Sequence, residues 1–178
     1  MSELYHYGRK GMKWGQHIYG EERIIKRKSK TNLEDHRKIY KALTKQGKRF
    51  ISGSTEKEEP PKTMFDNELG YKENVYAQRL YKIGKTPVAV CDAWYMDYNK
   101  KHDLNISIMT NPKYERKGYA SAVIKDLIGS TVLDTKIKDI YWFADVNNTA
   151  SNNLAKKQGF KYMQTYDNGT MNMYKYKR

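Results

Sequence analysis

Cysteine is nearly absent from this chain, and so are long apolar runs. Cys91 is the only cysteine among 178 residues, so no disulfide can form within the chain and a reducing compartment is expected. One cysteine and four scattered histidines form no zinc-binding spacing, and we expect no metal. No stretch approaches the roughly 20 apolar residues that a membrane helix needs, and the first residues lack the apolar core of a secretory signal. We therefore expect a cytoplasmic protein without a membrane partner.

Acidic residues are also scarce. The chain has 34 Lys and Arg against 20 Asp and Glu, a net charge of +14. Such a charge is typical of proteins that bind nucleic acids or other polyanions. The basic residues are spread along the whole chain, however, and the densest run lies at residues 23–30. The charge indicates a basic, solvated surface that favours phosphate-bearing ligands, and a nucleic-acid-binding module is an alternative that rests on charge alone.

The first 31 residues differ in composition from the rest. They have four glycines, few aliphatic residues and many basic and aromatic ones, which predicts a flexible tail over residues 1–31. Residues 6–15, His-Tyr-Gly-Arg-Lys-Gly-Met-Lys-Trp-Gly, resemble a short tract on proteins of tailed bacteriophages, some of them virion-associated. This resemblance implies that the tail docks to a phage structural protein or to nucleic acid, with the protein in the host cytoplasm or in the virion.

A helical lead-in and a loop are predicted over residues 32–65. Asn32 and Asp35 have the spacing of a capping box, and an apolar stripe follows at helical spacing. Gly47 is expected to end this helix, and Phe50 begins a short apolar pair that indicates a first strand. Residues 56–61, Glu-Lys-Glu-Glu-Pro-Pro, predict a loop before the core.

The core is predicted to span residues 66–178 as a mixed α/β sheet. Hairpin turns are expected at residues 84–85 and 167–169. An apolar face at i, i+3, i+4, i+7 and i+8 predicts a helix from Tyr119 to Ile128 that packs on the sheet. The expected strands are residues 75–81, 88–96, 103–110, 137–146, 160–166 and 170–176.

Residues 115–120, Glu-Arg-Lys-Gly-Tyr-Ala, form the most informative stretch. They connect the strand at 103–110 to the helix at 119–128. The first N–H groups of a helix have no intrahelical acceptor, and the helix dipole places about half a positive charge at that end. Gly118 allows the backbone to approach a phosphate, and two basic side chains precede it. This turn therefore predicts an anion-binding cradle.

A second pattern follows about thirty residues later. The buried strand at 137–146 ends in Asn-Asn-Thr, where Asn148 or Thr149 can serve as the N-cap of a helix. Gly159 closes this helix, and Phe160 begins the next strand.

Together these two patterns resemble the GNAT N-acetyltransferases. Residues 148–160 resemble the second signature of the family. Residues 106–120 resemble the first, in which a turn of the form Gln/Arg-x-x-Gly-x-Gly/Ala grips the pyrophosphate of acetyl-coenzyme A. The resemblance covers residues 66–178. It departs from the family pattern at Glu115, where Gln or Arg is usual, and at Ala155, where many members carry the tyrosine that protonates the departing thiolate.

The resemblance implies acetyl-coenzyme A as co-substrate and an amine as acceptor. Backbone groups of Ile108, Met109 and Thr110 would pair with the pantetheine arm, and the Asn148 side chain would meet the cofactor. Ile108 is alternatively a core residue, and Asn148 a plain N-cap. The residues that would wrap the pyrophosphate are Arg116, Lys117, Gly118, Tyr119, Ala120 and Ser121.

The proton-transferring residues are not determined by the sequence. Asp92 and Asp145 lie on strands expected to face the cleft, and either is a candidate base or a structural group. The donor missing at position 155 could be replaced by a tyrosine or by a water route. The candidate tyrosines are Tyr162, Tyr166 and Tyr174.

The predicted function is an acetyl-coenzyme A-dependent N-acetyltransferase. The alternative is a phage virion-associated protein that uses the same fold for assembly or binding, with weak or no catalysis. Glu115 and Ala155 favour this alternative, whereas Gly118 and the pattern at 148–160 favour the enzyme.

Overall fold

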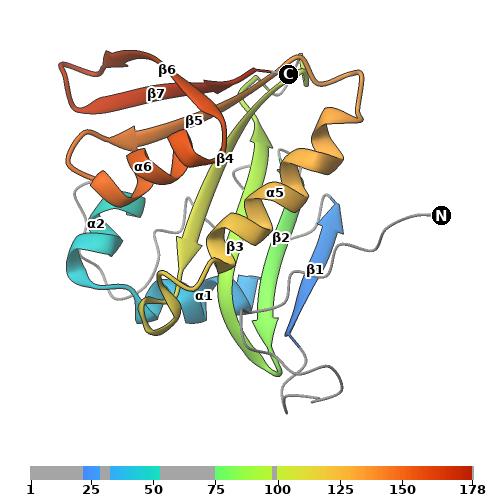
Figure 1. The fold of residues 1–178 in the computed structure, drawn as a ribbon, viewed down its shortest axis with the longest axis vertical. Coiled ribbons are helices and arrows are strands. Elements are labelled where there is room, and N and C mark those ends of the chain that lie inside the picture. The colour runs from blue at the N-terminus through green and yellow to red at the C-terminus, as the bar shows by residue number, and fades with distance from the viewer. Residues whose placement is uncertain (1–21, 29–32, 53–74, 98–99, 178) are drawn as a thin grey trace.

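One seven-stranded sheet organises the chain (Figure 1). The computed structural model describes residues 22–28, 33–52, 75–97 and 100–177. Strand order is β1-β2-β3-β4-β5-β7-β6, and every neighbouring pair is antiparallel except β4 and β5, which are parallel. This mixed sheet with helices on its faces confirms the predicted fold class.

The strands are β1 Glu22–Lys28, β2 Val75–Ile83, β3 Thr86–Tyr95, β4 Asp103–Thr110, β5 Asp139–Asp145, β6 Phe160–Tyr166 and β7 Met171–Tyr176. The helices of the described residues are α1 Leu33–Ala42, α2 Lys45–Ser52, α5 Tyr119–Val132 and α6 Thr149–Lys157, with a short 3-10 turn, η1, at Pro112–Tyr114. The predicted strands and helices of the core are present, although α5 runs one turn further than expected. Among the described residues no helix is both long and apolar enough to cross a bilayer.

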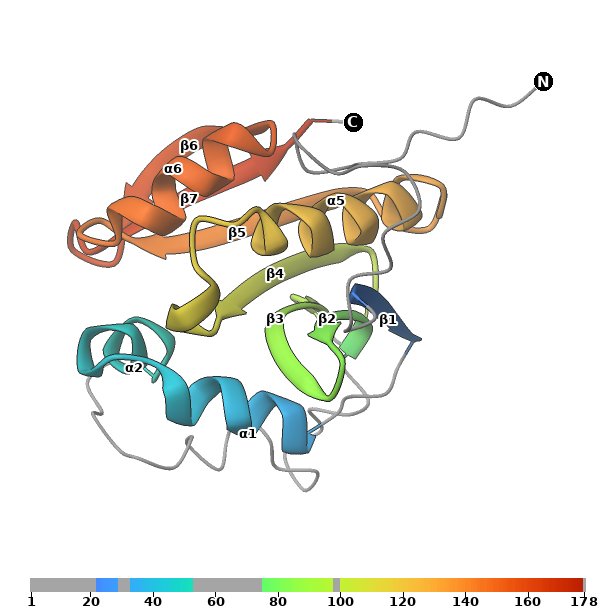
Figure 2. The same ribbon diagram turned by 60° about the horizontal axis from the view of Figure 1, so that its bottom comes forward.

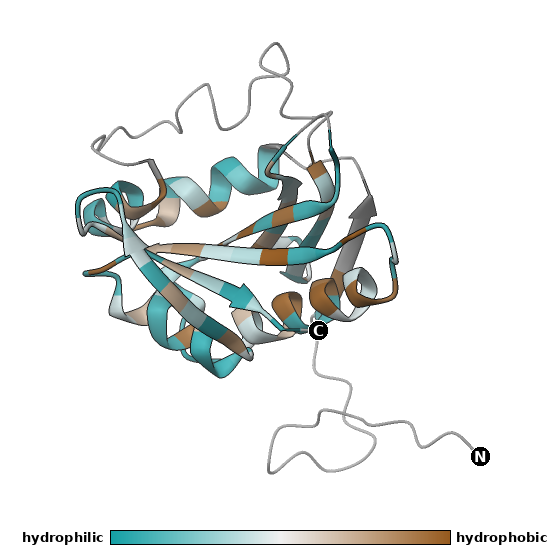
Figure 3. Cartoon of the chain, turned by 90° about the horizontal axis from the view of Figure 1, so that it is seen from above, coloured by the Kyte–Doolittle hydropathy of each residue, from teal (hydrophilic) through white to brown (hydrophobic). Residues whose placement is uncertain are grey.

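The helices form two layers around the sheet. Figure 2 shows α5 and α6 on one face and α1 and α2 on the other. The predicted apolar face of α5 is buried against the sheet, and the hydropathy colouring shows α5 as largely apolar (Figure 3). A smaller cluster lies under α1, where Ile39 and Tyr40 pack against Leu80, Val90 and Met109.

The edge strand β1 lies where the sequence predicts a tail. Residues Glu22–Lys28 pair antiparallel with β2 along their whole length, and Ile24 packs against the core. A basic segment with two adjacent isoleucines has no clear strand period, so its strand conformation depends on the hydrogen bonds that β2 supplies. The tract at residues 6–15 lies outside the described residues.

The predicted helix ending at Gly47 is instead two helices. The break falls at residues 43–44, where the Thr44 hydroxyl oxygen accepts the Gly47 N–H at 3.0 Å and caps the start of α2. Gly47 therefore lies inside α2, and the strand predicted around Phe50 is wrong because this segment is helical. The expected cap at Asn32 and the loop at 56–61 lie outside the described residues.

Candidate functional site

The parallel strands β4 and β5 separate partway along their length. They pair only from Asp103 and Asp139 to Ile106 and Trp142, and beyond that point the strands diverge (Figure 1). Residues 107–110 remain paired with β3 on their other side. One backbone edge of this segment therefore faces the opening, where it can hydrogen-bond an extended ligand as an added strand would.

The predicted pantetheine-binding residues lie on this edge. Ile108 is half-buried and its side chain packs against the main core, so it is a core residue, as the alternative interpretation of this position predicted. The Met109 side chain points to the other face and packs in the cluster under α1. Their side chains thus hold β4 in place on both faces, while the backbone at residues 108–110 lies beside the opening.

The turn after β4 leads into an uncapped helix start. Gly118 is the N-cap of α5 with φ 89°, and it supplies no side-chain cap. Arg116 is also left-handed, with φ 60°. A Cβ at Gly118 would meet no atom within 4 Å, so glycine is required there by the backbone conformation rather than by crowding. Uncapped N–H groups after such a turn are suited to an anion.

Aromatic packing holds the turn in place. The Lys117 ammonium lies 5.3 Å from the ring centre of Tyr114, which packs edge-on against Tyr119 at 6.4 Å. Tyr119 is only 6% exposed and also packs against Tyr81, with ring centres 4.7 Å apart. The Tyr119 side chain therefore anchors the start of α5 to the sheet.

Glu115 lies at the entrance of the turn. It is exposed, and its N–H donates to the Pro112 carbonyl as the C-cap of η1. Within the described part of the chain its carboxylate makes no ion pair. Its charge is thus not neutralised by the adjacent Arg116.

Asn148 is the N-cap of α6, one of the two N-cap residues that the sequence predicted. Its Oδ1 accepts the Ser151 N–H at 3.1 Å. The Ser151 hydroxyl in turn accepts the Trp142 indole N–H at 3.0 Å, which joins α6 to β5 at the residue where β4 and β5 part. Ala155, at the position of the family's tyrosine, is fully buried in the core.

The three candidate tyrosines are placed differently with respect to the opening. Tyr162 and Tyr166 lie on the edge strand β6, with β7 between them and β5. Tyr174 lies on β7 opposite Trp142, is 1% exposed, and donates from its hydroxyl to Asn152 Oδ1 on α6 at 2.7 Å. Burial raises the pKa of Tyr174. Of the three, Tyr174 is therefore nearest to the opening, but its hydroxyl is already engaged.

Both aspartates have structural partners, which agrees with the structural alternative given for each of them. Asp92 is 2% exposed beneath α1, where it contacts His36 and Gln78. The Asp145 carboxylate accepts the Asn147 N–H at 2.7 Å and so caps the turn after β5. The expectation that Asp92 faces the cleft is wrong, because α1 covers that face of β3.

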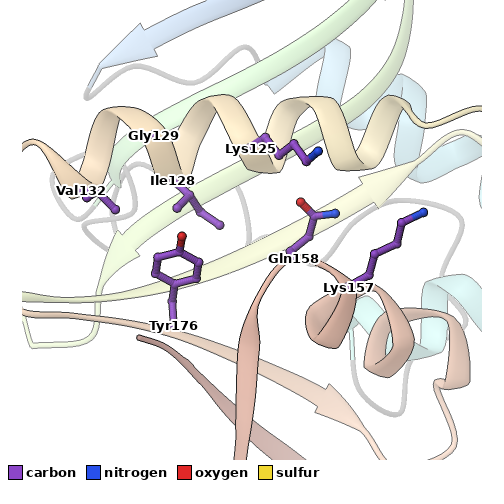
Figure 4. A pocket seen from close by; sticks show the side chains of 7 residues that line it. All are labelled: Lys125, Ile128, Gly129, Val132, Lys157, Gln158 and Tyr176. Atoms are coloured by element: carbon purple, nitrogen blue, oxygen red, sulfur yellow. The ribbon is translucent and has the colours of Figure 1, made fainter. Parts of the chain in front are cut away.

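A cleft of about 370 Å³ lies between α5, the end of α6 and the end of β7 (Figure 4). The Gln158 amide donates to the Ser121 hydroxyl at 3.1 Å, so the cleft adjoins the first turn of α5. Two ammonium groups border it. The lining residues are Lys125, Ile128, Gly129, Val132, Lys157, Gln158 and Tyr176.

Comparison with known proteins is decisive for the family. A family model for the acetyltransferase (GNAT) domain matches residues 27–161, well over half of the chain. The chain belongs to the GNAT acetyltransferases. The co-substrate of this family is acetyl-coenzyme A, which confirms the cofactor predicted from the sequence. No curated protein matches this chain in sequence.

Solved structures of GNAT acetyltransferases share the fold at low identity. The GNAT domain of S. lividans PAT has a TM-score of 0.69 at 10% identity, covering 89% of this chain and 94% of its own. The putative acetyltransferase yncA from Salmonella typhimurium, solved with acetyl-coenzyme A, has a TM-score of 0.60 at 13% identity, with 85% and 92% covered. The Salmonella typhimurium acetyltransferase that modifies the N-terminal serine of ribosomal protein L7/L12 has a TM-score of 0.59 at 17% identity, with 85% and 93% covered.

In the described part of the chain, no group of His, Cys, Asp and Glu side chains is arranged to hold a metal ion.

Proposed function

We propose that the protein transfers the acetyl group of acetyl-coenzyme A to an amine at the opening between β4 and β5. The observation that carries this proposal is the end of the parallel ladder at Ile106 and Trp142. It leaves a backbone edge at residues 107–110, and the chain then passes through η1 and the turn at residues 115–118 to the uncapped start of α5. An extended arm with a pyrophosphate at one end requires this combination of strand edge and anion cradle.

The cofactor contacts follow from this arrangement. The pantetheine arm pairs with the backbone of residues 108–110, and the pyrophosphate lies on the N–H groups at residues 116–121. Since Asn148 Oδ1 is used as the helix cap, its amide nitrogen is the group that meets the cofactor. The cleft bordered by Lys125 and Lys157 adjoins the cradle and offers two cations to the remaining phosphate of coenzyme A.

The acceptor amine approaches from the face opposite α5. Because the cradle belongs to the α5 layer, the arm enters the opening from that side, and the face covered by α1 and α2 remains for the acceptor. The thiolate formed by the transfer is protonated by Tyr174 or by water, since position 155 carries no hydroxyl.

Two measurements test the proposal. Calorimetry with coenzyme A and acetyl-coenzyme A measures binding, and thiol release with a panel of polyamines, amino acids and short peptides measures transfer. Peptides with an N-terminal serine belong in the panel, because one structurally similar acetyltransferase modifies such a terminus. Binding without thiol release toward any amine would instead favour a binding or assembly role.

A phage-associated role rests on residues 6–15 alone, which lie outside the described residues. Co-sedimentation of the full chain with phage structural proteins or with DNA, compared with a chain lacking residues 1–21, tests that role.

A further inference from the structure

A buried asparagine connects the end of β5 and the start of α6 with β7. Asn152 on α6 is 7% exposed, and its side-chain amide makes hydrogen bonds at both ends. Its Nδ2 donates to the carbonyl oxygens of Asp145 and Asn148, both at 2.8 Å. Its Oδ1 accepts from Asn172 Nδ2 at 2.9 Å and from the Tyr174 hydroxyl at 2.7 Å. The donors and lone pairs of the amide are thus all used, and such a satisfied buried group fixes the elements that it joins.

The orientation of this amide follows from its partners. Backbone carbonyl oxygens can only accept hydrogen bonds, so the amide nitrogen faces Asp145 and Asn148 and the amide oxygen faces β7. An aspartate at position 152 would keep the bonds from β7 but would put a carboxylate oxygen against two carbonyl oxygens. Asn152→Asp therefore removes one half of the network and keeps the other.

The donor half of Asn152 closes the turn between β5 and α6. The Asn148 N–H donates to the Asp145 carbonyl at 2.9 Å, and Asn152 Nδ2 bonds the carbonyl at each end of this turn. The Asn152 N–H also makes the ordinary helical bond to the Asn148 carbonyl, at 3.0 Å. The main chain of Asn148 is therefore fixed at both its N–H and its carbonyl.

One polar group of Asn148 remains available. Its Oδ1 accepts the Ser151 N–H at 3.1 Å, whereas its Nδ2 has no partner within the described residues. Asn148 is half-buried and follows β5, which parts from β4 after Trp142. An amide nitrogen can only donate hydrogen bonds, so in this position it fits a carbonyl oxygen.

We propose that Asn152 is a positioning residue, which holds Asn148 so that its Nδ2 donates to a carbonyl oxygen of the pantetheine arm. This inference rests on the proposed binding of acetyl-coenzyme A at the opening. The pantetheine arm contains amide carbonyls, which are suitable acceptors. Because Asn152 is buried, it acts through Asn148 and not on the ligand itself.

The alternative is that Asn152 only ties α6 to β7. The two roles use opposite ends of the same amide: Oδ1 accepts the bonds from β7, and Nδ2 donates the bonds to the turn. They can therefore be separated. Loss of a bond from β7 should lower stability alone, whereas loss of the bonds to the turn should also weaken binding of the arm.

The first test compares coenzyme A with its nucleotide half, adenosine diphosphate bearing the ribose phosphate. In Asn152→Asp we expect the affinity for coenzyme A to fall roughly three- to tenfold, the effect of losing about one hydrogen bond. The affinity for the nucleotide half, which lacks the arm, should not change, because the cradle at the start of α5 is not part of the network. Calorimetry measures both ligands. A general loosening of the fold would weaken both.

Two control variants belong to this test. Asn153→Asp adds the same charge one residue along α6, at an exposed side chain that makes no hydrogen bond within the described residues. Asn172→Ala removes one bond to Asn152 Oδ1 and leaves Nδ2 in place. Neither variant should weaken coenzyme A binding relative to the nucleotide half. If Asn152→Asp does not fold, Asn152→Ala replaces it, since alanine puts no oxygen against the two carbonyls.

The second test uses the wild-type protein. Heteronuclear NMR resolves the side-chain amide signals, and the signal of Asn148 is assigned by its loss in Asn148→Ser, where the hydroxyl can still cap α6. We expect this signal to shift when coenzyme A is added and to stay in place when the nucleotide half is added alone.

The outcomes separate the two proposals. A wild-type protein that does not bind coenzyme A refutes the proposed function, and the inference with it. Binding by the wild type, together with an Asn152 variant that binds both ligands as before or loses both equally, overturns the inference alone. An Asn148 amide signal that coenzyme A leaves in place also overturns it.

Discussion

The Tyr119 hydroxyl donates a hydrogen bond to the Glu22 carboxylate, 3.3 Å away, across 97 positions of the chain. The same carboxylate accepts from the Tyr81 hydroxyl at 3.2 Å. Glu22 begins the edge strand β1 and Tyr119 begins α5, so the edge of the sheet is connected to the first helical residue of the cradle. β1 therefore helps to position the helix start that we propose for the pyrophosphate.

We expect Tyr119→Phe to weaken coenzyme A binding a few-fold. The substitution keeps the ring packing but removes the bond to Glu22, which is worth about 0.5–1.5 kcal/mol, and so loosens the start of α5. Calorimetry measures the affinity. Tyr81→Phe removes the other bond to Glu22, keeps the ring that packs against Tyr119, and is the matched control. Equal affinity changes in the two variants would contradict the positioning role.

Gly118→Asp should weaken coenzyme A binding more than tenfold, or above about 1.4 kcal/mol, because it puts a carboxylate beside the N–H groups of the cradle. Gly169→Asp controls for backbone strain, since Gly169 has a similar φ of 85° and equally open surroundings in the turn between β6 and β7. A folded Gly118→Asp protein that binds coenzyme A as tightly as the wild type would show that the cradle lies elsewhere.

Glu115→Gln should tighten coenzyme A binding. The Glu115 carboxylate is exposed and makes no ion pair in the described residues, and like charges a few ångströms apart repel by about 1 kcal/mol even in water. The gain should increase at low salt, where screening is weaker. Glu34→Gln, on the opposite layer, changes the net charge equally and should have no effect. Unchanged binding in Glu115→Gln would mean that the carboxylate points away from the ligand.

Removal of residues 1–28 should lower the melting temperature more than removal of residues 1–21. Only the longer deletion removes β1, and with it the hydrogen bonds to β2 and the packing of Ile24. For a chain of this size each kcal/mol corresponds to about 2–4 °C, so a loss of a few kcal/mol is readily measured by calorimetric melting. Equal melting temperatures for the two truncated proteins would show that β1 adds no stability.

Stability should fall between about pH 10 and 12, and Tyr76→Phe should reduce that fall. Burial, and then the hydrogen bond to Asp134 at 3.0 Å, raise the pKa of Tyr76 from 10.0 to about 12. The folded protein thus keeps a proton that the unfolded chain loses above pH 10, so this contribution is complete below pH 10 and is lost as the pH rises to about 12. Urea unfolding at pH 9, 10.5 and 12 measures it. An equally steep decline in Tyr76→Phe would exclude Tyr76 as a cause.

The sequence by itself determined the elements whose signals are local. The strand predicted at residues 103–110 has the limits of β4, Asp103–Thr110. Asn148 was a predicted N-cap, and its partner, the Ser151 N–H, lies only three residues away. The order of strands and helices was predictable because it too depends on local signals. Together with the two signatures, this order indicated the GNAT fold.

Only the tertiary structure decided the features that depend on distant partners. β1 is a strand because β2 lies beside it, and the tail-like composition of residues 22–28 contains no sign of that pairing. Asp92 is buried because α1 brings His36 onto it across 56 positions, which no spacing along the chain reveals. The opening between β4 and β5 is likewise a property of the sheet. Hydrogen-bonding partners that are far apart in sequence come into contact only when the chain folds, and the proposed site depends on such long-range contacts.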